Sequence, residues 1–385
     1  MAEISVQTSS WRKWSEFAPT WERIHNMCPA ASFFISREWV TCWLETFGEE
    51  LNPDLLAFAA EGEVIGCCLL VWRTQWVRGI PLRRVYLNCA GEDEAESTCL
   101  EFNSLLSLPE YEGHVAEALV TFLRGRKWDE LLLAGAVEQG AIQILAGSLG
   151  ANEVAEAPSY YIEFGGLPNP PADFLGSVSS KTRYHIRRTQ RAYEEIGGAC
   201  TVRVAQSPEE ALGMLRQLAE LHQARWEGRG QPGAFHSPRF TEFHEAVIRQ
   251  AFDRTLMFRV QAGAVVVGLL YCFLFRGWVY FYQSGFSYAL DSRRNPGLLT
   301  LSLTISHCLA QPELKGFDFM AGDREYKRSL ASTHHSLRWI VVRRPTARSF
   351  LFRGLRWLKR AGVRVLHRTR HASQPPDATP PSTEG

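Results

Sequence analysis

Residues 55–71 and 255–271 of this 385-residue chain have the same layout. Each segment is an apolar run, a short turn that contains a glycine, and a second apolar run that contains another glycine. Apolar runs of this length around a glycine turn predict a β-hairpin. In both places more strand material follows, then a helix near 113–125 or 297–310, and then a strand that ends in Ala-Gly. The sequence therefore predicts one α/β fold that is built twice.

The chain is expected to divide near its middle, at a Gly-, Pro- and Asn-rich segment over 165–171, because these residues interrupt both helices and strands. We predict a first domain over residues 1–165 and a second over 166–337. Two further segments complete the chain. They are a basic strand and amphipathic helix over 338–371 and a Pro-, Ser- and Thr-rich tail over 372–385, which we expect to be disordered.

The composition is that of a globular protein in a reducing compartment. Hydrophobic residues make up 45% of the chain and charged residues 22%, as in ordinary soluble domains. The nine cysteines are scattered without a Cys-x-x-Cys pair, so we expect free thiols in a cytoplasmic protein and no metal site. The first residues contain neither a basic nor an apolar stretch, so we expect no signal peptide. The uncharged run over 260–275 is too short to span a membrane.

Basic residues are concentrated near the C-terminus. Residues 338–371 contain 11 Lys and Arg and no acid, whereas the first 337 residues contain 31 basic and 39 acidic residues. Leu351, Leu355 and Leu358 recur at helical spacing in this block, which predicts a basic amphipathic helix. Such a helix can bind an anionic surface, and it would place the protein peripherally at the inner membrane. Docking onto the acidic body is the alternative, and nucleic acid is not expected as a partner.

A group of polar side chains accompanies the apolar strand over 316–321. Asp318 lies in the strand, and Tyr326 and Lys327 follow it closely. Strand ends are rigid and the loops after them are accessible, so α/β folds place catalytic groups there. We predict all three as catalytic residues: Asp318 would orient the nucleophile or accept its proton, and Lys327 would stabilise an oxyanion. The alternative is an Asp–Lys surface pair with little effect.

The first copy has a similar outline at 128–136. Asp129 stands there as the match of Asp318, but no Tyr-Lys sequence follows it. We therefore expect the first domain to be degenerate, as a structural unit or one wall of the substrate site.

Two predicted helices carry the candidate substrate-binding residues. The helix over 179–196 places Arg183 and Arg187 on one face, and a row of guanidinium groups suits phosphate or an anionic glycan. The alternative is a solvated face that nearby glutamates balance. The helix over 208–226 carries His222 and Trp226 one turn apart beside a Gly-rich loop. They would contact a substrate, although packing in the core is the more common role of a lone histidine on an apolar face.

Taken together, these features resemble the GNAT superfamily of acetyltransferases, present in tandem. The resemblance covers residues 15–335 and rests on the order and spacing of the segments 179–188, 221–226, 282–286 and 318–327. The chain is similar in particular to the FemAB-like subgroup associated with cellulose and exopolysaccharide biosynthesis. The resemblance implies two α/β domains, each a mixed, mostly antiparallel sheet flanked by helices.

The resemblance also implies acetyl-CoA or another acyl-CoA as co-substrate. In the GNAT architecture the strand at 278–284 separates from its neighbour and leaves backbone N–H groups for the pantetheine arm, while the pyrophosphate lies at the start of the next helix. The cofactor-binding residues would then be Tyr282, Gln283, Ser284, Arg293, Arg294 and Gly297. The sequence departs from the family in two ways. Only the spacing from Arg294 to Gly297 approximates the phosphate-loop motif, and the helix lacks the usual general-acid tyrosine, which leaves Tyr326, His307 or no residue at all for that role.

The sequence therefore predicts an acyltransferase in which an amine or hydroxyl attacks the thioester directly, helped by positioning and oxyanion stabilisation. The family implies a sugar or another cell-envelope precursor as acceptor. Two alternatives stay open. One is an aminoacyl-tRNA-dependent transferase of the Fem type, which the altered phosphate loop and the basic C-terminal helix favour. The other is a non-catalytic binding or assembly protein with two degenerate domains.

Overall fold

The computed structural model describes residues 4–352, apart from 138, 152, 168–173 and 289–293. Of the predicted basic helix, only the helical stretch over 347–352 falls within the described residues, and the predicted tail lies outside them. Among the described residues, no helix has the length and apolar character needed to cross a membrane.

The strands form one sheet. Those of the first half are β1 (Ile4–Ser10), β2 (Asp54–Ala60), β3 (Glu63–Val77), β4 (Ile80–Leu87), β5 (Leu106–Ser107), β6 (Glu130–Val137) and β7 (Glu153–Glu163). Those of the second half are β8 (Cys200–Val204), β9 (Thr255–Ala262), β10 (Val265–Phe275), β11 (Trp278–Phe286), β12 (Gly316–Ala321) and β13 (Thr333–Arg343).

Helices cover the sheet in both halves. The first half contains α1 (Trp14–Met27), α2 (Arg37–Leu51), α3 (Glu112–Arg124) and α4 (Ala141–Ser148). The second contains α5 (Phe174–Ser177), α6 (Ser180–Gly197), α7 (Pro208–Glu227), α8 (Pro238–Gln250), α9 (Pro296–Leu309) and α10 (Glu325–Leu330).

The two halves of the sheet repeat one topology, as the duplicated hairpins predict. Strands β1 to β4 are adjacent and antiparallel, and β6 pairs in parallel with β4. Strands β8 to β11 are likewise adjacent and antiparallel, and β12 pairs in parallel with β11. In each half two helices follow the first strand and one helix, α3 or α9, precedes the parallel strand. The predicted mixed, mostly antiparallel α/β architecture is confirmed.

The glycine inside each hairpin is required by the helix that crosses it. A Cβ on Gly66 would lie 2.9 Å from the Val115 side chain of α3, and one on Gly268 would lie 2.6 Å from the Thr300 hydroxyl of α9. Both helices therefore sit closer to the sheet than a side chain at these positions would permit. The glycine pattern that repeats in the sequence corresponds to one packing contact that repeats in the structure.

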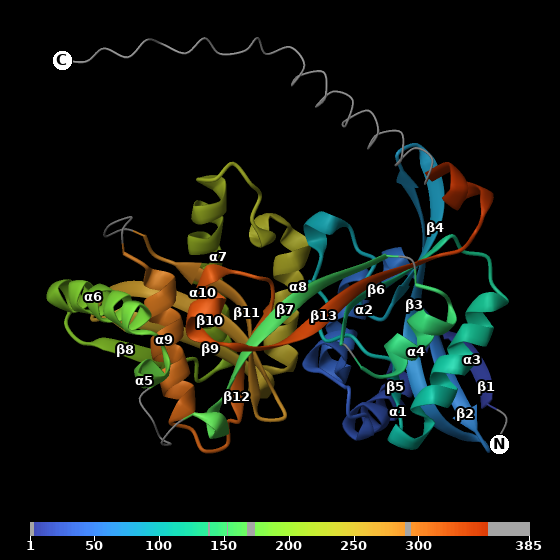
Figure 1. Ribbon diagram of the computed structural model, residues 1–385, viewed down its shortest axis with the longest axis horizontal. Helices are drawn as coiled ribbons and strands as arrows, with labels where there is room; N and C mark the ends of the chain where they lie inside the picture. Colours follow the sequence, from blue (N-terminus) through green and yellow to red (C-terminus); the bar gives the residue numbers. More distant parts are fainter. Residues whose placement is uncertain (1–3, 138, 152, 168–173, 289–293, 353–385) are drawn as a thin grey trace, which may run out of the picture.

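The last strand of each half belongs to the sheet of the other half (Figure 1). β7 pairs antiparallel with β12, with Ile162 opposite Phe317, and β13 pairs antiparallel with β6, with Val342 opposite Leu131. β7 and β13 also pair with each other, so the sheet order is β1-β2-β3-β4-β6-β13-β7-β12-β11-β10-β9-β8. The expected boundary at 337/338 falls inside β13, and the division into separate domains stays a prediction.

The core is continuous between the halves. On one face of the second half, α6 and α9 bury Ile186 and Leu299 against the sheet. On the other face, the core of α7 and α8 extends into the first half, where Trp39 of α2 meets Phe243 of α8 edge to face with ring centroids 4.8 Å apart. A buried aromatic contact of this kind holds the two halves together by dispersion and apolar burial.

Candidate functional site

Two parallel strands of the second half separate after a short pairing. β11 and β12 pair only from Trp278 opposite Gly316 to Tyr280 opposite Asp318. Beyond that point β11 continues beside β10 and β12 continues beside β7. Residues 281–286 therefore lack a strand partner on the β12 side among the described residues, so their backbone groups on that side make no sheet hydrogen bonds.

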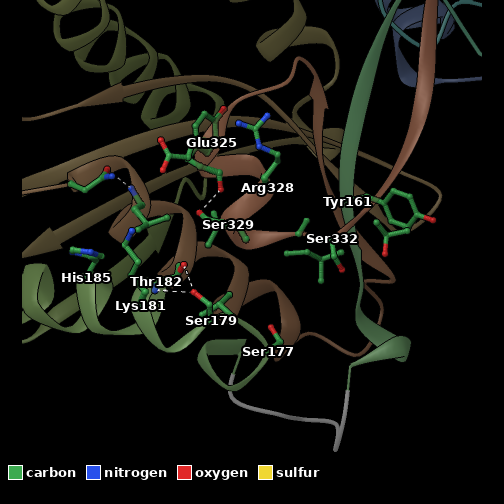
Figure 2. A pocket seen from close by; sticks show the side chains of 18 of the residues that line it. Tyr161, Ser177, Ser179, Lys181, Thr182, His185, Glu325, Arg328, Ser329 and Ser332 are labelled. Carbon is green, nitrogen blue, oxygen red and sulfur yellow. Dashed lines mark hydrogen bonds between the residues drawn. The ribbon is translucent and has the colours of Figure 1, made fainter.

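A cavity of about 1000 Å³ lies on the α6 and α9 face of the second half. It is bounded by α6, the start of α9, α10 and parts of β7 and β13 (Figure 2). Its cationic side chains are Lys181, Arg188, Arg294 and Arg328, and its carboxylates are Glu163 and Glu325. Hydroxyl groups of Ser179, Ser329 and Ser332 also line it. Excess positive charge and many hydroxyl groups suit an anionic, polar ligand.

The start of α9 forms one wall of this cavity. The Asn295 side chain caps the helix by accepting a hydrogen bond from the Leu298 N–H at 3.0 Å, and both residues line the cavity. Arg294 lines it too and donates to the Arg188 carbonyl at 3.3 Å. Gly297 lies behind the wall, where a Cβ would come within 3.0 Å of the Phe286 ring. The predicted contribution of Arg293 lies outside the described residues.

The arginine face of α6 lines a second hollow of about 600 Å³. Arg188 and Arg294 border both spaces, so the two are adjacent. The second hollow also exposes the predicted substrate-binding residues Arg183 and Arg187, together with Arg191 and Tyr184. Of the two glutamates expected to balance this face, Glu194 accepts a hydrogen bond from Gln190, whereas Glu195 lines the hollow beside the arginines and offsets part of their charge. The face is therefore a concentration of positive charge next to the cavity.

Asp318 faces the opposite side of the sheet from the cavity, because Phe317 and Phe319 on either side of it belong to the α6 and α9 core. The carboxylate is 1% exposed. Its Oδ1 accepts hydrogen bonds from the Ser159 hydroxyl at 2.8 Å and the Met320 N–H at 2.7 Å. Its Oδ2 lies 3.3 Å from Nε2 of His335, whose side chain is 40% exposed. A buried carboxylate 3.3 Å from a half-exposed imidazole is suited to acid–base chemistry.

Tyr326 and Lys327 lie on different sides of α10. Tyr326 lines the cavity, and burial raises its pKa to about 12. Lys327 is 5% exposed, and its ammonium group donates to the carbonyls of Met320 at 2.8 Å and Ala321 at 2.7 Å. Burial lowers the pKa of Lys327 to about 8, against the charges of nearby carboxylates. Lys327 thus fixes the end of β12, and the three predicted catalytic residues do not all face the cavity.

Glu101 of the first half lies at the same place, although no motif marks it in the sequence. Its Oε2 accepts a hydrogen bond of 2.7 Å from the N–H of Ala321. Burial raises the pKa of Glu101 to about 7. The Ala321 hydrogen bond and the charge of Lys327 oppose that rise, and Asp318 adds to it. Two carboxylates and an ammonium group are therefore coupled between the two halves.

The loop that carries Glu101 fills the corresponding gap of the first half. There β4 and β6 also pair over only a few residues. Asn103 then bridges to Ala136, and its N–H donates to the Gly135 carbonyl at 3.0 Å. Gly135 has φ of +57°, and a Cβ there would lie 2.4 Å from the Leu100 carbonyl. In the described residues, the gap that is open between β11 and β12 is thus occupied in the first half by the chain itself.

Asp129 is not the positional counterpart of Asp318, which corrects the expected match. It precedes β6, whereas Asp318 lies within β12. Asp129 is fully buried and accepts hydrogen bonds from the Arg83 guanidinium at 3.0 and 3.1 Å and from the Thr346 hydroxyl at 2.7 Å. Burial alone would raise the pKa of Asp129, but these hydrogen bonds lower it to about 2. Its role is to join β4, β6 and the segment after β13.

His222 and Trp226 do not line the cavity. The Nδ1–H of His222 donates to the Ser284 carbonyl at 3.2 Å, and its Nε2 accepts from the Ala234 N–H at 3.3 Å. Burial lowers the pKa of His222, which favours the neutral ring. Trp226 packs beside this ring. Both ring nitrogens of His222 have backbone partners, as expected for the alternative in which His222 packs in the core. A contact between His222 or Trp226 and a substrate stays a prediction.

The predicted cofactor residues of β11 lie in its diverging part. Gln283 and Ser284 pair with β10 and have no partner in β12. The Tyr282 side chain packs among aromatic rings on the α8 face, and its hydroxyl donates to the Thr98 carbonyl of the first half at 2.7 Å. Only backbone atoms of Tyr282 are therefore placed to meet a ligand in the gap.

Comparison with known proteins agrees with this fold. Residues 180–328 match the model of the acetyltransferase (GNAT) domain family. The crystal structure of FemX superimposes with a TM-score of 0.53 at 10% identity, covering 84% of this chain and 96% of FemX. A conserved protein of unknown function from Bacteroides thetaiotaomicron VPI-5482 gives 0.54 at 9% identity, covering 89% of this chain and 100% of that one. No curated protein matches the sequence.

A third solved structure has a related fold. The C-terminal domain of a putative lysylphosphatidylglycerol synthetase from Agrobacterium fabrum gives a TM-score of 0.50 at 8% identity, covering 88% of this chain and 95% of that domain. Identities this low establish a shared fold and nothing finer. The chain therefore shares a GNAT-like fold with these proteins, and its residues 180–328 are similar to the GNAT acetyltransferase domain.

Proposed function

We propose that this chain is an acyl-CoA-dependent acyltransferase whose second half binds the thioester. The proposal is carried by one observation, the cationic cavity at the start of α9 in the half where β11 and β12 diverge. A helix N-terminus with arginines beside it stabilises a pyrophosphate. Open backbone groups along β11 suit the amides of a pantetheine arm. Coenzyme A carries both groups in one molecule.

The reaction would be a direct transfer. An acceptor amine or hydroxyl attacks the thioester carbonyl, and the thiolate leaves as the new C–N or C–O bond forms. Positioning and charge stabilisation would supply most of the rate enhancement, since no covalent enzyme intermediate is needed. Tyr326 is the candidate to protonate the thiolate, because it lines the cavity and its raised pKa keeps the phenol protonated at neutral pH.

The proposed acceptor is a sugar or another cell-envelope precursor that carries an anionic group. Arg183 and Arg187 would bind that group in the hollow that adjoins the cofactor cavity. The finer assignment to exopolysaccharide or cellulose biosynthesis rests on the family resemblance.

Calorimetric titration with acetyl-CoA tests the cofactor site. Replacing Arg188 and Arg294 together by Ala should weaken binding more than tenfold, which is about 1.4 kcal/mol. The matched control replaces Arg203 of β8 and Arg249 of α8, which pair with Glu210 of α7 and Glu245 of α8 away from the cavity, and it should bind like the wild type. Equal affinity of both double variants would refute the placement. A wild-type protein that binds no acetyl-CoA would refute the function.

An aminoacyl-tRNA-dependent transferase of the Fem type is the second candidate. The arginine face of α6, with Tyr184 62% exposed beside it, favours this candidate because phosphates and unstacked bases are bound by such surfaces. Binding of tRNA should then fall steeply with salt and should weaken when Arg183 and Arg187 are replaced by Ala. A chain that binds neither tRNA nor acetyl-CoA in thermal-shift assays would be a binding or assembly protein.

We also propose that the C-terminal segment brings the enzyme to an anionic membrane. Phe350 and Leu351 are 58% and 63% exposed, and Trp76 at the end of β3 is 74% exposed. Phe352 anchors the same helical turn against Ile80 and Leu82 of the β3–β4 hairpin, and Figure 1 shows the turn beside this hairpin at one end of the molecule. Exposed apolar side chains at the start of a basic segment suit insertion among anionic headgroups.

A further inference from the structure

We infer that Glu101, contributed by the first half, is the general base that activates the acceptor in the second half. The inference rests on the proposed function, because it assigns a residue to the transfer step. It makes the acceptor site a composite of the two halves.

The loop around Glu101 spans the gap between β11 and β12. On one side, the Thr98 carbonyl accepts a hydrogen bond of 2.7 Å from the Tyr282 hydroxyl of β11. On the other side, Glu101 accepts its hydrogen bond of 2.7 Å from the N–H of Ala321, the last residue of β12. Both contacts lie beyond the last β11–β12 pair, which is Tyr280 with Asp318. The Glu101 carboxylate therefore stands at the opening in which a thioester between the two strands would end.

The position of Glu101 is strongly constrained. Cys99 and Phe102 have φ of +51° and +53°, and Met320, just before the residue that Glu101 contacts, has φ of +58°. Residues other than glycine adopt this region at a cost of order 1–3 kcal/mol and keep it only where the surroundings enforce it. Here Gly135 and Asn103 enforce it by packing the loop into the gap of the first half. Strain held in this way is common around active sites.

The charge environment suits a base. Among the described residues Oε1 of Glu101 accepts no hydrogen bond, so this atom is available to an acceptor proton. The titratable groups that face Glu101 are Lys327 of α10, Asp318 of β12, Tyr282 of β11 and Cys99 of its own loop. Burial raises the pKa of Glu101 to about 7, so near neutral pH it exchanges protons readily. The Asp318 carboxylate, in contrast, already contacts the Ser159 hydroxyl, the Met320 N–H and His335.

The acceptor nitrogen or oxygen attacks the thioester carbon while Glu101 takes the proton that the acceptor loses. The C–S bond breaks as the new C–N or C–O bond forms, and the thiolate takes a proton from Tyr326 or from solvent. Glu101 then releases its proton to water, and a Tyr326 that has donated takes a proton back from water, with Lys327 and Asp318 unchanged in charge over the cycle.

Thiol release from acetyl-CoA with glucose as acceptor, whose hydroxyl groups stay protonated over the whole range, tests the inference across pH. In the wild type, kcat/KM should fall as the pH drops below about 7, because protonated Glu101 cannot act as a base. Glu101→Gln should lower kcat at least 100-fold and remove this acid limb. The Gln amide oxygen still accepts the Ala321 hydrogen bond, so the fold and the affinity for acetyl-CoA should be unchanged. The matched control is Glu92→Gln, a half-buried glutamate of the same loop that accepts from the Thr98 N–H and hydroxyl, and it should keep the limb.

Two outcomes would overturn the inference while leaving the proposed function intact. One is a Glu101→Gln variant with wild-type rate and acid limb. The other is a limb that survives in Glu101→Gln and disappears in His335→Asn, which would make the His335–Asp318 pair the base. A wild-type protein that neither binds acetyl-CoA nor releases thiol would overturn the proposed function and this inference with it.

Discussion

Asp129 and Asp318 are both buried carboxylates, one just before β6 and the other within β12, but they have different partners. Asp129 meets the guanidinium group of Arg83 and the hydroxyl of Thr346, whereas the partners of Asp318 are a hydroxyl, an N–H and a half-exposed histidine. We therefore predict that Asp129→Asn lowers stability and leaves acetyl-CoA binding unchanged, because the charge it removes holds β4 and β6 together far from the cavity.

The magnitude follows from the pKa of Asp129. The folded protein lowers it from an ordinary value of 3.8 to about 2, and at 1.36 kcal/mol per pKa unit the ionised form contributes about 2.4 kcal/mol. The Arg83 side chain is 33% exposed and water can partly solvate it, so the observed loss should be about 2 kcal/mol. Because the folded pKa is the lower one, this contribution is present above pH 4 and is lost as the pH falls from 4 towards 2. By pH 3 about half of it should remain.

Urea denaturation followed by tryptophan fluorescence checks this prediction at pH 7 and at pH 3. The difference in the free energy of unfolding between the wild type and Asp129→Asn should become smaller as the pH falls. Asp323→Asn is the control, since its ion pair with Arg328 is exposed and its removal should leave the free energy of unfolding unchanged. If Asp129→Asn unfolds with the same free energy as the wild type at pH 7, or if the difference between them is the same at both pH values, the ion pair with Arg83 contributes no net stability.

Three further predictions concern the site and the ends of the molecule. Asp318→Asn should lower kcat more than tenfold with the acetyl-CoA dissociation constant within a factor of two, and a variant with full turnover would make Asp318 purely structural. Gly135→Ala should lower both the melting temperature and the transfer rate, because its Cβ would displace the Leu100 carbonyl. Gly147→Ala is the control and should melt like the wild type, since the space around Gly147 is open. Equal melting temperatures of the two variants in calorimetry would contradict this prediction. Full-length protein should pellet with anionic vesicles at low salt, whereas a chain ending at Phe352 should stay in the supernatant. The shortened chain keeps the hydrogen bonds of Thr346 and Ser349 to Asp129. Equal recovery of both proteins in the supernatant would mean that the basic segment binds no membrane.

Local patterns predicted the elements well because their causes are local. The hairpins follow from apolar runs and turn glycines, and the helix over 180–197 begins where the Ser179 hydroxyl caps the Thr182 N–H at 3.1 Å. The cavity wall at Arg294 followed from the same reasoning, since an arginine beside a helix N-terminus is a local feature. Such signals depend on residues a few positions apart, which a single sequence displays directly.

Glu101 and His335 were missed because their placement depends on distant pairings. Glu101 reaches the site only because its loop lies across the gap between β11 and β12, and His335 does so only because β13 crosses to pair with β7. Neither residue stands in a motif, and each is separated from its partners by long stretches of chain. The contacts of Lys327 were not predicted for a related reason. Its position in the sequence is at the site, but its side chain is buried and the ammonium group donates to two backbone carbonyls.

The crossing of β7 and β13 has a consequence for how the protein is made. The sheet of the first half pairs its β6 with residues of β13, such as Val342 with Leu131, so this half cannot be completed until almost the whole described chain has left the ribosome. Pairings between such distant segments close large loops and form slowly. Until then the edge of β6 stays unpaired, and an exposed strand edge can associate with other chains. Synthesis of this protein should therefore depend on chaperones that shield the first half while the second is being translated.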